Sequence, residues 1–264
     1  MDPLPLKDRA VVIVGGTTGL GFSAARVCVG AGARVVVVGR NPDSARGAAN
    51  ALGPMTVAFT GDAADSKTAP AAIELALKEF GRFDALYHVA GGSGRRAGDG
   101  PLHEITDEGW DYTHRLNLTS LFYSDRAAVR QFLKQKTPGT VLNMGSVLGA
   151  SPSPKYFATH AYASTKSAAI GFTRSLAAYY APQQIRFNLI VPALVETPMS
   201  QRAATDERIM KFVATKQPLD GGRIGRPEDL DAAVVFFLSD ASKFCTGQVL
   251  TIDGGWSVTE GQYE

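Results

Sequence analysis

Short runs of apolar, mostly β-branched residues alternate along this chain with segments of helix length. Most of the runs are apolar throughout, which is typical of strands covered on both faces. The alternation predicts a doubly wound parallel α/β sheet of about seven strands with helices on both faces. The expected strands are Ala10–Val14, Arg34–Val38, Thr56–Phe59, Ala85–Val89, Thr140–Met144, Arg186–Val191 and Val249–Ile252. The expected helices are Leu20–Gly30, Pro42–Leu52, Ala69–Phe80, Asp107–Lys134, Tyr162–Tyr180, Met199–Lys216 and Pro227–Leu238.

No linker, repeat or low-complexity segment interrupts this alternation, so residues 1–264 are expected to form one domain. Pro42 and Pro227 stand where a first-turn proline is favoured in a helix. The glycine-rich stretch 91–100 directly follows an expected strand. We interpret it as a loop over a site.

Charge and cysteine content narrow the classes of partner. Lys plus Arg number 27 and Asp plus Glu number 25, a net charge of +2 with no long block of either sign. This balance argues against a nucleic-acid or membrane surface. Cys28 and Cys245 fit no metal-site or CxxC spacing, so we expect a reduced, cytoplasmic protein and no metal. The first residues contain no apolar segment typical of a signal peptide, and the apolar runs are too short to span a bilayer.

The first strand-to-helix turn carries three glycines, Gly15, Gly19 and Gly21. We expect Gly15 to permit a sharp turn, Gly19 to let the backbone approach a pyrophosphate, and Gly21 to allow close helix–strand packing. The helix that follows supplies free N–H groups and a positive dipole end to an anion. The spacing differs from GxGxxG. The alternative is that the three glycines form a tight strand-to-helix turn that binds no phosphate.

The end of the second strand bears on the choice of cofactor. It reads Val38-Gly39-Arg40, without the acidic residue that binds a ribose 2′-hydroxyl in NAD sites. Arg40 can pair with a 2′-phosphate, so NADP(H) is favoured over NAD(H), unless Arg40 is an ordinary surface charge. Thr18 adds a hydroxyl near the same phosphate, and Asp62 is placed to accept from an adenine amino group or to form a turn.

Tyr162 and Lys166 are four residues apart, which places them on one face of a helix. An ammonium beside a phenol favours the phenolate, so we expect the pKa of Tyr162 to be lowered. Such a pair moves a proton on or off an alcohol oxygen. Taken alone, a tyrosine and a lysine at this spacing are more often a packed ring and a solvated charge.

The motifs together resemble the single-domain branch of the short-chain dehydrogenase/reductase family, and the likeness covers essentially the whole chain. It implies a Rossmann-type fold and hydride transfer between a nicotinamide cofactor and a small carbonyl or alcohol substrate. The motifs, in order, are the turn Gly15–Gly21, Asp62, Ala90-Gly91, Asn117, Ser146, Tyr162 with Lys166, Pro192 to Thr197, Gly225 to Asp229, and Asp253 to Gly255.

The resemblance implies roles for individual residues. Tyr162 is the expected acid/base, Lys166 lowers its pKa and binds the nicotinamide ribose, and Ser146 holds the substrate oxygen. Asn117 is expected to help hold a water in a proton relay. A segment at about 197–218 is the expected mobile part of the substrate site. The expected cofactor-binding residues are Gly15, Thr17, Thr18, Gly19, Leu20, Gly21, Arg40, Asp62, Ala63, Ala90, Gly91, Tyr162, Lys166, Pro192, Val195 and Thr197.

Several positions depart from the family pattern. Val14 replaces a threonine before the first glycine, and His88-Val89 replaces a pair of asparagines that steady the sheet. We interpret His88 as a packed core histidine. Ala193 replaces the glycine after Pro192. The segment Pro152–His160 is longer than usual and lines the substrate pocket or forms a surface flap.

Basic residues near the expected pocket bear on the substrate. They suggest an anionic or CoA-linked carbonyl compound, or else they are solvated loop charges. They are Arg95 and Arg96 in the glycine-rich loop, and Arg202, Arg208 and Lys211 after Thr197. Small residues along the Tyr162 helix permit close approach of a second copy, and the resemblance implies a homotetramer.

Two other functions remain open at the level of sequence. The first is reduction of an enoyl thioester, which in the family often shows a changed tyrosine–lysine spacing. The second is a regulator that senses NADP without turnover. Such proteins tend to lose the tyrosine or the lysine, and both are present here.

Overall fold

The computed structural model describes residues 4–263; residues 1–3 and 264 of the expected domain lie outside the described range. Within that range, seven parallel strands form one sheet in the order β3-β2-β1-β4-β5-β6-β7. The predicted doubly wound α/β sheet is confirmed. The strands are β1 (Ala10–Val14), β2 (Arg34–Gly39), β3 (Thr56–Thr60), β4 (Ala85–His88), β5 (Gly139–Met144), β6 (Ile185–Pro192) and β7 (Val249–Ile252).

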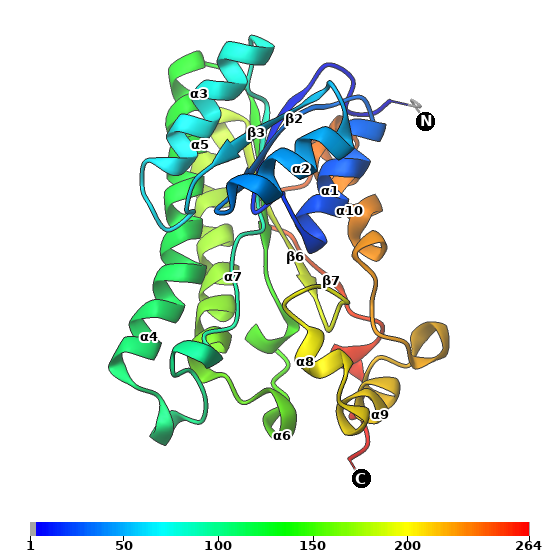
Figure 1. Cartoon of the computed structure of the whole chain (residues 1–264). Coiled ribbons are helices and arrows are strands. Elements are labelled where there is room, and N and C mark those ends of the chain that lie inside the picture. The colour runs from blue at the N-terminus through cyan, green and yellow to red at the C-terminus, as the bar shows by residue number, and fades with distance from the viewer. Residues whose placement is uncertain (1–3, 264) are drawn as a thin grey trace.

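Helices cover both faces of the sheet, as Figure 1 shows. Alternate side chains of the central strands pack into two separate cores, because successive side chains of a strand point to opposite faces. Ile13 and Val37 pack on α1 and α10, whereas Val12 and Val36 pack on α3 and α5. The helices are α1 (Gly19–Gly30), α2 (Pro42–Leu52), α3 (Thr68–Phe80), α4 (Asp107–His114), α5 (Ser120–Gln135), α6 (Pro154–Phe157), α7 (His160–Tyr180), α8 (Gln201–Ala204), α9 (Glu207–Lys216) and α10 (Asp231–Leu238).

The helix predicted over 107–134 is wrong as one continuous element. The structure has α4, then a π-helical turn at Arg115–Thr119, then α5. Asn117 lies in this turn, and its amide donates to the carbonyl of Thr113 at 2.9 Å. The hydroxyl of Ser120 donates to the carbonyl of Leu116 at 2.6 Å. Side chains that hydrogen-bond carbonyls of the preceding turn compete with the regular helical pattern, and π-turns are frequent at functional sites.

The helix predicted over 199–216 is also divided. The structure has α8 and α9, because Asp206 stands between them in extended conformation and begins α9. Its carboxylate accepts hydrogen bonds from the backbone N–H groups of Arg208 and Ile209. A capping aspartate favours a helix start over a continued helix. The helix predicted over 227–238 likewise begins with a 3₁₀ turn at Pro227–Leu230 before α10.

The segment Pro152–His160 contains a helix that the sequence did not predict. Pro154 begins the one-turn α6, which ends at Phe157. Its backbone leads directly into α7, which carries Tyr162 and Lys166. In Figure 1, α6 lies at the same end of the molecule as α8 and α9.

Candidate active site

The carboxyl ends of the central strands open into a cavity of about 900 Å³. Val14, Met144 and Pro192, near or at the ends of β1, β5 and β6, all line it. The chain crosses from one side of the sheet to the other between β1 and β4. Ligands of open α/β sheets bind at such a switch point.

The glycine turn forms one wall of the cavity with the geometry expected of it. Gly15 has φ +90°, and a Cβ there would lie 2.6 Å from the backbone N of Ala90. A Cβ on Gly21 would lie 2.0 Å from the carbonyl oxygen of Gly15, so this glycine allows α1 to pack on the turn. Thr18 precedes α1 without a side-chain cap. The first N–H groups of α1 therefore remain available to an anionic ligand.

The far end of the cavity lies beside β2. Arg40 is exposed there and makes no hydrogen bond or ion pair with any residue in 4–263. A Cβ on Gly39 would lie 2.5 Å from the hydroxyl oxygen of Thr17. An acidic side chain in place of Gly39, as NAD sites carry at the end of this strand, would therefore require Thr17 to shift.

Asp62 lines the same end of the cavity. One of its carboxylate oxygens accepts from the backbone N–H of Ala64 at 2.9 Å, so Asp62 forms a turn. The second oxygen has no hydrogen-bond donor among the described residues. Contact of this oxygen with an adenine amino group stays a prediction.

Tyr162, Lys166 and Ser146 meet at the other end of the cavity. The helical spacing of α7 places the Lys166 ammonium 5.6 Å from the centre of the Tyr162 ring. Lys166 is buried and donates to the carbonyl of Met144, the last residue of β5, at 3.0 Å. Ser146 follows the same strand, and its hydroxyl oxygen accepts from the backbone N–H of Leu148. The predicted cluster is therefore assembled from α7 and the end of β5.

The pKa of Tyr162 is raised, because burial disfavours the phenolate more than the neighbouring Ser146 hydroxyl favours it. The lowering predicted from Lys166 is wrong for this structure. Burial also lowers the pKa of Lys166 to about 8, so its ammonium is still largely protonated at neutral pH, yet the burial of the phenol outweighs it. A phenol that stays protonated at neutral pH can donate a proton to a carbonyl oxygen.

Asn117 lies behind the cavity and does not line it. Its amide donates to the carbonyl of Gly92, and its side-chain oxygen accepts from the N–H of the same glycine, each at 2.9 Å. The side chain thus fixes the start of the glycine-rich loop. A Cβ on Gly91 would lie 2.7 Å from the Asn117 oxygen and 3.6 Å from the Lys166 ammonium. The predicted water relay is not tested by these contacts.

Asp99 is a site residue that sequence reasoning missed. It is buried in the glycine-rich loop, and its two carboxylate oxygens accept from the backbone N–H groups of Ala161 and Tyr162 at 3.0 Å each. Thr159, which precedes α7, provides no side-chain cap. Asp99 therefore caps the helix that carries the tyrosine from 63 residues away in sequence. A cap at that separation leaves no local signal.

His88 is buried at the end of β4, as predicted for a core histidine. Its Nδ1 lies 2.9 Å from the Ser124 hydroxyl and its Nε2 lies 3.3 Å from the Ser120 hydroxyl. The Ser120 proton is donated to Leu116, so the histidine carries its proton on Nε2 and accepts from Ser124. Burial and the Lys166 charge lower the pKa of His88 to about 3. This neutral ring joins β4 to α5.

The structure brings most of the predicted cofactor-binding residues together around the cavity. Gly21 is the exception: it does not line the cavity, and it allows α1 to pack closely on the glycine turn. The predicted residues that line the cavity are Gly15, Thr17, Thr18, Gly19, Leu20, Arg40, Asp62, Ala63, Ala90, Gly91, Ser146, Tyr162, Lys166, Pro192, Val195 and Thr197.

The predicted basic residues divide into two groups. Arg95 and Arg202 line the cavity. Arg96 is exposed outside it, and Arg208 pairs with Asp206 at the start of α9. Lys211 does not line the cavity.

The residues present fit a dinucleotide. A free helix N-terminus and a glycine wall suit a pyrophosphate, and an unpaired arginine lies at one end of the cavity. A buried ammonium lies at the other end, beside the phenol. In residues 4–263 no cluster of three or more His, Cys, Asp or Glu could hold a metal ion, and no helix is long and apolar enough to cross a membrane.

Comparison with known proteins identifies the family. The family model described as "Enoyl-(Acyl carrier protein) reductase" matches residues 14–257. The chain is 32% identical over 252 residues to 2-dehydro-3-deoxy-D-gluconate 5-dehydrogenase of Dickeya dadantii, across 95% of this chain and 96% of that protein. A short-chain type dehydrogenase/reductase from Mycobacterium ulcerans has a TM-score of 0.88 at 30% identity, across 97% of this chain and 92% of its own. A 3-ketoacyl-(acyl-carrier-protein) reductase from Brucella melitensis, complexed with NADH, has a TM-score of 0.84 at 26% identity, across 96% and 100%. The chain belongs to the short-chain dehydrogenase/reductase family of NAD(P)-dependent oxidoreductases.

Proposed function

We propose that this chain is an NADP(H)-dependent oxidoreductase that interconverts a carbonyl and a secondary alcohol, with cofactor and substrate held in one domain. The proposal rests mainly on one observation. Ser146, Tyr162 and Lys166 line the same cavity as the glycine turn. The nicotinamide, when bound, supplies or accepts the hydride. Tyr162 then donates a proton to the carbonyl oxygen, and the Ser146 hydroxyl holds the same oxygen.

Two further residues position this pair. Lys166 is proposed to bind the nicotinamide ribose hydroxyls through its ammonium, which the Met144 carbonyl already orients. Asn117 is proposed to support the proton relay while it holds the glycine-rich loop. Val195 and Thr197, which follow β6, are proposed to fix the nicotinamide carboxamide.

The preference for NADP(H) rests on the end of β2. Arg40 is unpaired among the described residues and exposed at the cavity, and an acidic side chain at position 39 would require Thr17 to shift. A 2′-phosphate would supply the anion that Arg40 lacks, in a charge-assisted contact. NAD(H) is the alternative cofactor, because the similar reductase from Brucella melitensis is complexed with NADH.

Fluorescence titration with NADPH and NADH tests this preference. We expect NADPH to bind the wild-type protein at least about 10-fold more tightly than NADH, and Arg40→Ala to remove most of that difference. Arg46→Ala is the matched control, because Arg46 lies in the following helix α2, is paired with Asp43 and does not line the cavity. Tighter binding of NADH by the wild type would overturn the preference.

Tyr162→Phe tests the acid/base role. We expect turnover to fall by about 100-fold or more while NADPH binding is kept, because only the proton donor is removed. A variant that keeps its full turnover would contradict the role. A wild-type protein that binds NADPH and turns over no carbonyl or alcohol would instead support the NADP-sensing regulator.

Reduction of an enoyl thioester is the second candidate, since the matching family model is described as an enoyl reductase. The four-residue tyrosine–lysine spacing favours the carbonyl reaction. A side-by-side assay of acetoacetyl-CoA and crotonyl-CoA with NADPH separates the two. Faster oxidation of NADPH with crotonyl-CoA than with acetoacetyl-CoA would favour the enoyl reductase over the proposed carbonyl reductase.

We also propose a homotetramer that forms through α5 and α7. Ser167, Ala168 and Gly171 are exposed on α7, and a Cβ on Gly171 would contact nothing within 4 Å. Phe122 on α5 is 38% exposed, which adds apolar area to the same region. Light scattering at micromolar concentration should report four copies, and a monomer would refute the proposal.

A cytoplasmic location is proposed from the cysteines. Cys28 and Cys245 are both free thiols in the structure, and Cys28 is buried. Proteins of reducing compartments usually keep their cysteines in this form.

A further inference from the structure

Three segments far apart in the sequence converge over the substrate end of the cavity. They are the glycine-rich loop with its 3₁₀ turn at Arg95–Ala97, the short helix α6, and α8. Each supplies side chains to the cavity wall, Arg95 from the first, Phe157 from the second and Arg202 from the third.

The two arginines meet on one backbone atom. The Nη2 of Arg95 and the Nη2 of Arg202 each donate to the carbonyl oxygen of Tyr156 in α6, both at 3.2 Å. A carbonyl oxygen has two lone pairs, so these two bonds saturate it. Among residues 4–263 neither guanidinium has another acceptor. Each has five N–H donors, so most of the donors on both side chains have no partner among these residues. Both side chains line the cavity, Arg95 half-buried and Arg202 exposed.

Two positive charges that share one neutral acceptor repel each other. Burial and the charge of Arg202 lower the pKa of Arg95, and Asp99 offsets this only in part. The carboxylate oxygens of Asp99 accept from the backbone of α7, so Asp99 hydrogen-bonds neither guanidinium. An anion placed between the two guanidiniums would relieve the repulsion and fill the unused donors.

Apolar side chains form much of the remaining lining of the cavity. They include Leu148, Phe157, Met199 and Trp256, alongside the polar Ser93, Thr159 and Ser200. Such a wall suits a hydrocarbon segment, with polar groups at both of its ends.

We propose that Arg95 and Arg202 together bind an anionic group of the substrate, a carboxylate, sulfonate or phosphate, while the carbonyl or alcohol carbon lies against Ser146 and Tyr162. The inference rests on the proposed oxidoreductase function and specifies its substrate class as a compact organic anion. The planar guanidinium fork matches the oxygens of all three groups.

Equilibrium binding tests the proposal without turnover. The probes are cyclohexanecarboxylate, cyclohexanesulfonate, cyclohexyl phosphate and the neutral cyclohexanecarboxamide. Binding is followed by tryptophan fluorescence, since Trp256 lines the cavity, with and without NADP⁺. We expect at least one anion to bind about 10-fold or more tightly than the amide, and the order of the three anions identifies the group. Equal binding of amide and anions, or no binding of any anion at millimolar concentration, overturns the proposal.

Substitution of Arg95 and Arg202 tests whether these two residues cause the tighter binding of anions. The Arg95→Gln/Arg202→Gln double variant should lose the advantage of the anion over the amide. Arg96→Gln is the matched control, because it removes the same charge from the same loop outside the cavity. The Arg95→Lys/Arg202→Lys variant keeps both charges without the fork and should retain part of the advantage. Unchanged NADPH binding shows that each variant is folded. A double glutamine variant that keeps the full advantage contradicts the proposal.

Turnover separates this proposal from the function on which it rests. The substrates are 4-oxocyclohexanecarboxylate and its methyl ester, with NADPH. If neither ketone is reduced but the anion advantage is present and lost in the double variant, the oxidoreductase proposal fails and the anion site stands. If both ketones are reduced with equal kcat/KM in the wild type and the double variant, the anion site fails and the oxidoreductase stands.

Discussion

Arginines at the two ends of the parallel strands differ in how many of their N–H donors have an acceptor in the protein. At the amino end of β6, Arg186 donates four hydrogen bonds at 3.0–3.3 Å, to the carbonyls of Phe237, Ser239 and Cys245 and to the hydroxyl of Ser242. At the carboxyl end, Arg95 and Arg202 share one carbonyl. The comparison teaches that the fraction of donors already satisfied separates an arginine that holds the fold from one that awaits a ligand.

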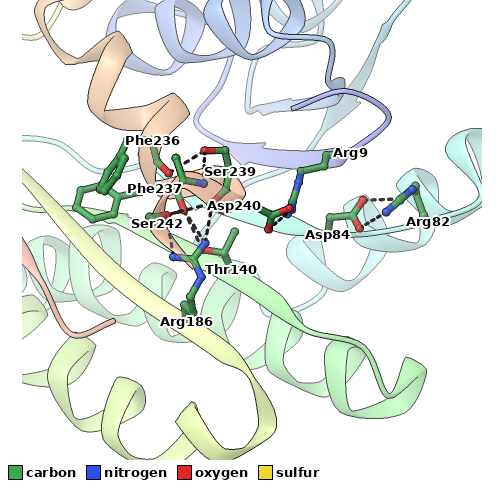
Figure 2. Close-up of polar contacts among 11 residues, drawn as sticks. Arg9, Arg82, Asp84, Thr140, Arg186, Phe236, Phe237, Ser239, Asp240 and Ser242 are labelled. Atoms are coloured by element: carbon green, nitrogen blue, oxygen red, sulfur yellow. Dashed lines mark hydrogen bonds and ion pairs between the residues drawn. The ribbon is translucent and has the colours of Figure 1, made fainter. Parts of the chain in front are cut away.

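Figure 2 shows the hydrogen bonds and ion pairs around Arg186 at the amino end. Arg186 reaches the last turn of α10 and the residues after it, where carbonyls have no partner within the helix. Arg82 pairs with Asp84, and Arg9 pairs with Asp240, beside the same cluster. The cavity end leaves comparable donors open, because the carboxyl ends of parallel strands and the helix starts beside them point their N–H groups at a ligand.

Arg186→Met should have the largest effect on stability. It removes four hydrogen bonds from a charged donor, although the three carbonyls keep other donors from Thr140, Ser242 and Asn188. We expect the free energy of unfolding to fall by about 3 kcal/mol. NADPH affinity per folded molecule should not change, since Arg186 lies at the opposite end of β6 from the cavity. Urea denaturation and NADPH titration measure the two quantities.

Arg40→Met is the control for this comparison. Within residues 4–263 Arg40 has no partner, so we expect stability within about 0.5 kcal/mol of the wild type and weaker NADPH binding. If Arg40→Met destabilised the protein as much as Arg186→Met, the contrast between the two ends of the sheet would be lost.

Asp99→Ala should have a smaller effect on stability and a direct effect on turnover. Two N–H groups at the start of α7 lose their acceptor, and we expect a loss of about 2 kcal/mol in the free energy of unfolding. Because Tyr162 is one of the two residues held, kcat should fall by about 10-fold or more. Asp107→Ala, at the exposed start of α4, is the control and should leave kcat unchanged. Full turnover in Asp99→Ala would show that the cap does not position the tyrosine.

Asp125→Asn should have the smallest effect on turnover and a visible effect on pH dependence. Asp125 is buried in α5, where it accepts from Asn143 at 2.9 Å, and burial raises its pKa to about 7. The folded protein therefore keeps a proton that the unfolded chain releases near pH 3.8. The stability from this group is full below about pH 4 and is lost as the pH rises through about 7.

Urea denaturation from pH 5 to pH 8 measures this effect. We expect the wild type to lose more stability across that range than Asp125→Asn, whose side chain does not ionise. One carboxylate oxygen of Asp125 has no hydrogen-bond partner among the described residues, which is consistent with a retained proton. Equal pH slopes in the two proteins would contradict the raised pKa.

The cofactor end of the cavity was predictable because its signals are local. Gly15, Gly19 and Gly21 lie within one strand–turn–helix, and Gly15 and Gly21 have the close contacts that their positions imply. The approach of Gly19 to a pyrophosphate stays a prediction. The sheet was predictable for the same reason, since fully buried strands read as apolar runs. The Tyr162–Lys166 pair follows from the helical period alone.

The substrate end was not predictable because its contacts are between distant segments. The carbonyl of Tyr156 carries no side-chain signal, and neither the Asp99 cap nor the π-turn at Asn117 is visible in a local pattern. The pKa of Tyr162 was predicted in the wrong direction because a charge is read from sequence more easily than burial. Arg95 was distinguishable from Arg96 only once the fold placed one inside the cavity and one outside.

The position of α6 has a consequence for redesign of this protein. Both guanidiniums are anchored to a main-chain oxygen, so replacing the Tyr156 side chain leaves their anchor in place. Shortening or exchanging the segment Pro152–His160 would instead release both at once. An engineer who wishes to move this scaffold toward uncharged compounds therefore has one segment to graft, while the glycine turn and the tyrosine helix stay as they are.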